Sequence, residues 1–142
     1  MTPSPIIGPV LAQVGLTLVM LLWLYAKRMP AMSNAKVDPE SLQRKDPKVA
    51  GTMPLSTHFP ADNFVNLFEA PMLFFVMCFV VHLTGYNDMV IINMAWAYVF
   101  LRALHSIIQS TYNRVVHRFI VYMLSSFVLI AMYARITLAY IA

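Results

Sequence analysis

Residues 64–84 read FVNLFEAPMLFFVMCFVVHLT, an apolar stretch that carries an amide and a carboxylate near its start, Asn66 and Glu69. The hydrocarbon layer of a membrane is about 30 Å thick, and about 20 apolar residues in a helix cross it. A charged side chain at the centre of such a helix costs about 2.5 to 3.5 kcal/mol, so it indicates a functional site by default. The stretch therefore predicts a membrane span that contains a polar site.

Three further stretches are long and apolar enough to cross a membrane, namely residues 6–26, 89–109 and 119–141. Together the four predict one domain over residues 1–142, an all-α membrane protein with a four-transmembrane-helix bundle. The composition agrees, because the 142 residues are 60% hydrophobic and 11% charged, whereas a soluble domain has about 25% charged residues. The net charge of +4 lies beside the spans rather than on a soluble face, so we expect no nucleic-acid partner.

The connections between the spans differ greatly in length. Residues 27–63 form a long polar segment, expected to be a loop with a short surface helix from Asp38, whereas residues 85–88 and 110–118 are short links. Short links make the second, third and fourth helices antiparallel neighbours. Pro9 and Pro71 are expected in the first turns of their helices, where a missing N–H is tolerated.

The basic residues predict the orientation in the membrane. One face holds the long loop and the 110–118 link, with Lys27, Arg28, Lys36, Arg44, Lys45, Lys48, Arg114 and Arg118, and the other face has no Lys or Arg outside a span. By the positive-inside rule the long loop is cytoplasmic and both termini are outside. Arg135, in the last span, can extend toward the outer interface or pair with a neighbouring subunit, and we expect the first.

Polar side chains recur at helical spacing in three of the spans. They are Asn66 and Glu69 in the second span, Arg102, His105 and Gln109 in the third, and Arg114, Arg118 and Tyr122 at the start of the fourth. Since each helical residue advances 1.5 Å, all three sets lie in the cytoplasmic third of the membrane. Lipid would leave them unsatisfied, so we expect them to face a shared interior or a subunit interface. The surplus of cations suits a small, mostly anionic ligand.

A purely structural reading is the alternative at this point. Glu69 can pair with Arg102, and Asn66 can form a hydrogen bond across the bundle, so that both would hold helices together. One carboxylate, however, cannot neutralise both Arg102 and Arg118. The histidines His82, His105 and His117 lack a compact metal-ligand pattern, so no metal site is predicted.

The run Asn66-Leu-Phe-Glu69-Ala-Pro71, with Arg102-x-x-His105 and Arg114-x-x-x-Arg118-x-x-x-Tyr122, resembles the MAPEG family, the membrane-associated proteins of eicosanoid and glutathione metabolism. The resemblance covers essentially the whole chain, and the run NLFEAPMLFF resembles an uncharacterised bacterial branch, which implies an integral protein of the bacterial inner membrane. It also implies a homotrimer that binds glutathione between subunits near the cytoplasmic face. The glutathione-binding residues it implies are Arg28, Asn66, Glu69, Arg102, His105, Arg114 and Tyr122, with Arg118 as the catalytic residue.

The residue types make this chemistry reasonable. Arginines hold the two carboxylates of glutathione, Glu69 takes its ammonium, and Arg118 stabilises the thiolate. A nearby cation lowers a pKa by about 1 to 3 units, which brings a thiol with a pKa of about 8.5 into the neutral range. The resemblance thus implies a glutathione-dependent membrane transferase or peroxidase acting on lipophilic electrophiles or lipid hydroperoxides that arrive through the lipid.

A non-catalytic role is the second hypothesis. The chain departs from the characterised enzymes at Gln109, which replaces a tyrosine, and at Phe119, which replaces a serine. A lipid-presenting member of the family works without catalysis. The alternative is therefore a membrane protein that binds lipid in its subunit clefts or docks as an accessory subunit of a larger membrane complex.

Overall fold

The computed structural model describes residues 4–36, 55–86 and 88–141. Within these ranges it contains one short 3₁₀ helix, η1 (Leu55–Thr57), and four long helices, α1 (Ile7–Ala35), α4 (His58–Thr84), α5 (Met89–Ser110) and α6 (Val115–Ile141). All four long helices are long and apolar enough to cross a membrane. The predicted all-α, four-helix membrane bundle is confirmed.

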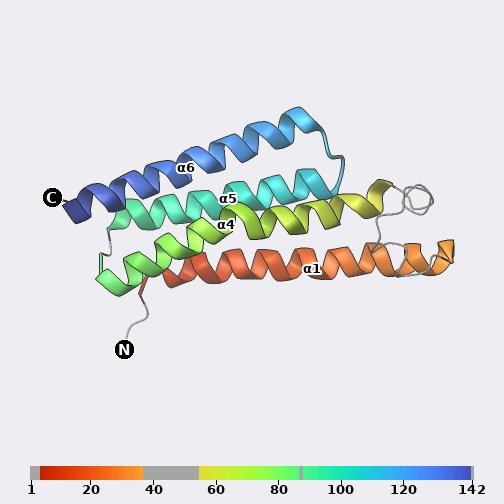
Figure 1. Ribbon diagram of the computed structural model, residues 1–142, viewed down its shortest axis with the longest axis horizontal. Coiled ribbons are helices and arrows are strands. Elements are labelled where there is room, and N and C mark those ends of the chain that lie inside the picture. The colour runs from red at the N-terminus through yellow and green to blue at the C-terminus, as the bar shows by residue number, and fades with distance from the viewer. Residues whose placement is uncertain (1–3, 37–54, 87, 142) are drawn as a thin grey trace.

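The four helices lie side by side and alternate in direction (Figure 1). α1 packs mainly against α4, α6 packs mainly against α5, and α4 and α5 contact each other between them. This confirms the prediction that the short links make α4, α5 and α6 antiparallel neighbours. The two termini lie at one end of the bundle with the α4–α5 link, and the α5–α6 link lies at the other end (Figure 1).

The apolar core lies toward the end that carries the termini. Its largest fully buried side chains include Phe74 of α4 and Tyr98 of α5, whose rings stack with centroids 4.7 Å apart. The outward faces are also apolar, and α6 buries only Ser125, Leu129 and Met132 among its described residues. Such a surface suits lipid on the outside of the bundle.

Helix α4 begins earlier than its hydropathy suggests. It starts at His58 and has Pro60 in its first turn, so the expectation that Pro71 lies in the first turn is wrong, because Pro71 is in the interior of the helix. Residues 58–63, which include the polar His58, Asp62 and Asn63, lie before the apolar stretch but already belong to the helix. Pro71 has no N–H, so the carbonyl of Leu67 loses its helical donor, and α4 bends in its middle (Figure 1).

Helix α1 also extends beyond its apolar stretch. It continues to Ala35 and ends where Lys36 adopts the left-handed conformation, with φ 50°. Arg28 therefore lies within this helix rather than at its end. The surface helix expected from Asp38 lies outside the described residues.

An ion pair closes the end of the bundle that carries the termini. Asp88 caps α5 by accepting a hydrogen bond from the N–H of Val90 at 3.0 Å, and Arg135 of α6 donates a hydrogen bond to the same carboxylate. This joins the α4–α5 link to the far end of α6.

Candidate functional site

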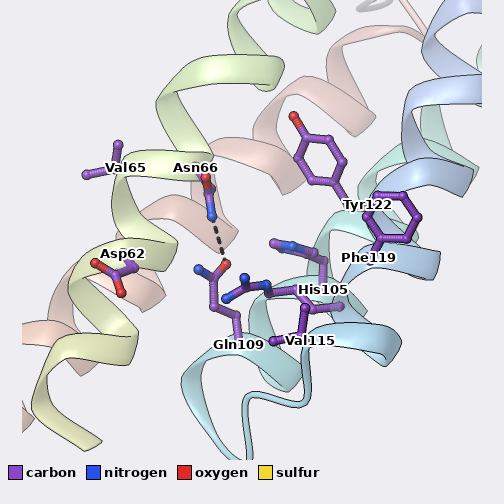
Figure 2. A pocket seen from close by; sticks show the side chains of 9 residues that line it. Asp62, Val65, Asn66, His105, Gln109, Val115, Phe119 and Tyr122 are labelled. Atoms are coloured by element: carbon purple, nitrogen blue, oxygen red, sulfur yellow. Dashed lines mark hydrogen bonds between the residues drawn. The ribbon is translucent and has the colours of Figure 1, made fainter. Parts of the chain in front are cut away.

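A pocket of about 530 Å³ lies between α4, α5 and α6, toward the α5–α6 link (Figure 2). Its lining comes from three helices and mixes charged, polar and apolar side chains: Asp62, Val65, Asn66, His105, Gln109, Val115, Arg118, Phe119 and Tyr122. The residues from α4 stand on one side, and His105, Phe119 and Tyr122 stand on the other (Figure 2). The volume falls in the range of about 300 to 1,000 Å³ that small-molecule sites occupy.

The α5 side of the pocket is a buried polar stripe. Arg102, His105 and Gln109 recur at helical spacing and are 0%, 1% and 2% exposed. The side-chain amide of Asn66 donates a hydrogen bond to Oε1 of Gln109 at 2.9 Å, which connects α4 to α5 (Figure 2). Polar residues of α4 and α5 therefore lie together, as predicted from their depth in the membrane.

Arg102 is the largest fully buried side chain of the described residues. Its Nη2 donates a hydrogen bond to the backbone carbonyl of Asn66 at 2.7 Å. Asn66 directly precedes Leu67, whose carbonyl has no helical donor because of Pro71. Its guanidinium carbon lies 5.3 Å from the centre of the Tyr122 ring, a cation–π contact. Nε and Nη1 of Arg102 have no hydrogen-bond partner within the described residues. Arg102 therefore keeps two unused donors next to the pocket.

Tyr122 connects this buried arginine to the pocket. Its ring also contacts His105, with centroids 5.6 Å apart and an angle of 58° between the ring planes. Nδ1 of His105 is buried and has no hydrogen-bond partner among the described residues. A ligand in the pocket would therefore meet an imidazole and a phenol whose positions depend on each other.

Arg118 supplies the guanidinium that lines the pocket from α6. It is half-buried, and its Nη1 donates a hydrogen bond to Oδ1 of Asn113 at 2.9 Å. Asn113 lies in the α5–α6 link with φ 48°, and its N–H donates to the carbonyl of Ile108 at 2.9 Å. The link thus holds one edge of the guanidinium, and no carboxylate pairs with Arg118 in the described part of the chain.

The structure places only some of the predicted site residues at the pocket. Asn66, His105, Arg118 and Tyr122 line it, and Arg102 adjoins it through Tyr122. Besides Arg102, three predicted residues do not line it, namely Arg28, Glu69 and Arg114. Glu69 and Arg114 are exposed, and Arg114 precedes α6 instead of sharing a helical stripe with Arg118.

The alternative pairing of Glu69 with Arg102 is not found among the described residues, where Arg102 bonds to the carbonyl of Asn66 instead. The part-buried hydrogen bond from the side-chain amide of Asn66 to that of Gln109 does match the structural role considered for Asn66, since it crosses from one helix to another. Part of the polar layer therefore holds the helices together, and the part formed by Arg118, His105 and Tyr122 faces the pocket.

The sequence prediction missed the acidic residue of the pocket, Asp62. It lies four residues before Asn66 and therefore on the same face of α4, but the apolar stretch begins only at Phe64, which left it in the expected loop. Asn113 was also missed, although asparagine is the residue besides glycine that adopts the left-handed conformation most readily.

The pocket lining includes a carboxylate on α4, a guanidinium on α6, two side-chain amides, an imidazole and a phenol. This set suits an organic ligand that carries both negative and positive groups. Within residues 4–36, 55–86 and 88–141, no group of three His, Cys, Asp or Glu side chains could hold a metal ion.

Comparison with known families gives a match over residues 6–138 to the model described as MAPEG family. The match includes every residue that lines the pocket. No curated protein and no solved structure matches the chain.

Proposed function

Because the chain belongs to the MAPEG family, we propose that it is a glutathione-dependent membrane transferase or peroxidase acting on lipophilic electrophiles or lipid hydroperoxides. The family includes glutathione transferases and peroxidases as well as members without catalytic activity. The observation that carries the proposal is the guanidinium of Arg118 in a pocket of small-molecule size, without a carboxylate partner among the described residues.

The pocket residues fit the chemical groups of glutathione. Arg118 can bind a carboxylate or a thiolate, and Asn66 and Gln109 offer amide groups. The unpartnered Nε and Nη1 of Arg102 add buried donors beside the pocket. A buried donor without a hydrogen-bond partner destabilises the protein by about 1 to 3 kcal/mol. An anionic ligand that accepts hydrogen bonds from these donors would remove that cost.

Glutathione would supply a thiol nucleophile at this site. Arg118 favours the ionised thiol, because a nearby cation lowers a pKa by about 1 to 3 units. Asn113 holds the guanidinium in place by accepting its Nη1 hydrogen bond. Val65, Val115 and Phe119 make part of the wall apolar, and excluding water there strengthens the interaction between charges.

The proposal includes a homotrimer in a bacterial inner membrane, with glutathione at subunit interfaces on the cytoplasmic side. The exposed side chains of Glu69 and Arg114 support this arrangement, since both lie outside the pocket of the single chain and are free to contact a neighbouring copy. The apolar outward faces of the helices support entry of a lipophilic second substrate from the lipid.

The test is a titration of the detergent-solubilised full chain with glutathione, followed by the ultraviolet absorbance of the thiolate across pH. We expect bound glutathione to form the thiolate near neutral pH in the native protein. In Arg118→Ala we expect the thiolate fraction to fall by about tenfold or more, because the charge of Arg118 lowers the thiol pKa by about one unit or more. Lys27→Ala is the matched control, since it removes an exposed cation of α1 that does not line the pocket and should leave the signal unchanged. Equal signals in Arg118→Ala and native protein, with both folded, would contradict the proposal.

Lipid binding without catalysis is the second candidate. A groove of about 760 Å³ lies between α4 and α6 toward the termini, and its lining is mainly apolar, including Leu73, Val76, Ile130 and Tyr133. A lipid chain would suit such a surface. Absence of glutathione binding, together with lipid that stays bound through purification in native mass spectrometry, would favour this role.

A further inference from the structure

A second group of buried polar side chains lies on α1, α4 and α5, apart from the pocket of Arg118. Each is at most 8% exposed and has at least one polar atom without a hydrogen-bond partner within the described residues: Gln13, Asn63, Tyr98, Arg102, Ser106 and Ser110. We call these six residues the polar seam. None of them lines the pocket. Native proteins leave few buried polar atoms unpaired, so the seam needs an explanation of its own.

The four members on α5 form one stripe of that helix. Tyr98, Arg102, Ser106 and Ser110 follow one another at intervals of four residues, which places them on the same side of α5. The stripe covers about 18 Å, because each helical residue advances 1.5 Å. It begins in the middle of α5 and ends at its last residue, Ser110, which is the most exposed of the four at 8%. The stripe therefore leads from the interior of the bundle to the end that carries the α5–α6 link.

Asn63 of α4 lies beside the outer part of this stripe. The stacked rings of Phe74 and Tyr98 show which residues of α4 and α5 share a depth. Asn63 lies eleven residues before Phe74, and the two helices run in opposite directions, so Asn63 lies at a depth between Ser106 and Ser110. Its amide nitrogen and oxygen are both buried and unpartnered among the described residues.

Gln13 of α1 lies beside the inner part of the stripe. A Cβ added at Gly8 would lie 3.1 Å from the ring of Trp96, so these two residues share a depth. Gln13 lies five residues after Gly8, and α1 and α5 run in the same direction, so Gln13 lies at a depth between Tyr98 and Arg102. The amide of Gln13 also has no hydrogen-bond partner in the described part of the chain.

We infer that bound water molecules lie in the polar seam between α1, α4 and α5, and connect the end of the bundle at Ser110 with the guanidinium of Arg102. Polar groups that share a depth without bonding directly are commonly bridged by water, and a buried water binds about three polar partners. The water accepts hydrogen bonds from Nε and Nη1 of Arg102 while no ligand does so. It thus solvates a charge within the hydrocarbon layer, where an unsolvated charge is costly. This water site goes beyond the proposed function and does not depend on glutathione.

The first test is hydroxyl-radical labelling of the full chain in detergent, in which an X-ray pulse forms radicals from water and mass spectrometry locates the oxidised side chains. Met132 of α6 is the matched control for Tyr98, because both are 0% exposed, and the thioether of Met132 oxidises readily but has no polar seam beside it. We expect Tyr98 to be oxidised at least about threefold faster than Met132, since only Tyr98 adjoins bound water. Oxidation of Tyr98 at the rate of Met132 or slower would overturn the inference.

The second test replaces a partner of the water. Leucine has the branched shape of asparagine without its hydrogen-bonding groups, so we expect Asn63→Leu to slow the oxidation of Tyr98 by about twofold or more and to lower the melting temperature. A dry seam would give the opposite sign, because the substitution would then remove an unpaired buried amide and raise the melting temperature. Such a rise would contradict the water site.

Ser106→Ala is the milder variant, for use if Asn63→Leu does not fold, and the same two changes are expected from it. Ser125→Ala is its matched control. It also removes a buried hydroxyl, but one whose Oγ donates to the carbonyl of Tyr122 at 2.7 Å. It should leave the oxidation of Tyr98 unchanged, whereas an equal decrease in Ser106→Ala and Ser125→Ala would rule out a role specific to the polar seam.

Discussion

Asn113 combines two properties that place the guanidinium of Arg118. Its left-handed backbone turns the chain between α5 and α6, and its side-chain carbonyl accepts the hydrogen bond from Nη1 of Arg118. A residue with a Cβ in this conformation costs about 1 to 2 kcal/mol, which Asn reduces through local hydrogen bonds and Gly avoids. The backbone role and the side-chain role can therefore be separated by substitution.

We expect Asn113→Gly to keep the fold and to weaken thiolate formation by a few fold, because the turn survives and the acceptor for Arg118 is lost. Asn113→Ala should weaken it equally and also lower the melting temperature, because alanine is strained at φ 48°. The measurements are the pH dependence of thiolate absorbance with bound glutathione and thermal unfolding by circular dichroism.

Tyr112→Phe provides the control for Asn113. It removes the hydrogen bond of the Tyr112 hydroxyl with Nδ1 of His117 at 3.2 Å, in the same link, without touching Arg118. Its pH dependence should match that of the native protein. A native pH dependence in Asn113→Gly would show that Arg118 does not need this acceptor.

The residues that the sequence analysis missed share a physical cause. Asp62 was missed because α4 begins at His58, before the apolar stretch starts at Phe64. Hydropathy indicates which residues lie in the membrane layer, not where the helix begins. The distribution of polar residues over depth did predict that Asn66, His105, Arg118 and Tyr122 approach one another. Depth and spacing could not reveal that Glu69 and Arg114 lie outside the pocket, because that depends on how far each helix is rotated and where α6 begins.

At the scale of the elements, the link between α4 and α5 is fixed to α6 by one ion pair. The hydrogen bond from Arg135 holds the pKa of the Asp88 carboxyl below its ordinary value, and the N–H of Val90 acts in the same direction. A lowered pKa in the folded state means that the pair stabilises the fold above the ordinary value of about 3.9. This stabilisation is lost as the pH falls through the lower, folded-state value.

We expect Asp88→Asn to lower the melting temperature at about pH 7, and we expect the difference from the native protein to shrink below about pH 4. Asparagine caps a helix about as well as aspartate, so the substitution removes the charge and leaves the cap of α5. The measurement is thermal unfolding in detergent across pH. Arg135→Gln should give the same pH pattern, and a difference that does not change with pH would contradict the role of the pair.

At the scale of the whole molecule, the apolar stretches and short links were sufficient to predict four helices and their order. They could not predict the bend of α4, since Pro71 was expected near a helix end where proline causes no bend. The core that joins the helices is small and lies toward the termini, whereas the polar groups collect toward the other end. The bundle thus separates its stabilising contacts from its candidate site.

The orientation of the bundle remains a prediction that labelling can check. Cys78 is 1% exposed, so the native chain gives little background with a membrane-impermeant maleimide. In bacterial cells that express the protein, we expect Tyr140→Cys to be labelled in intact cells and Ser56→Cys only in inverted membrane vesicles, because basic residues keep the long loop in the cytoplasm. The reverse pattern would show that the long loop faces outward.

The position of the two termini at one end of the bundle (Figure 1) has a practical consequence. Two copies can be encoded as one polypeptide, with a soluble spacer between Ala142 of the first and Met1 of the second, and the spacer need not cross the bilayer. Such a tandem protein can carry one native copy and one altered copy in a fixed ratio. Ligand binding to such a protein would show whether two neighbouring copies both contribute residues to one binding site.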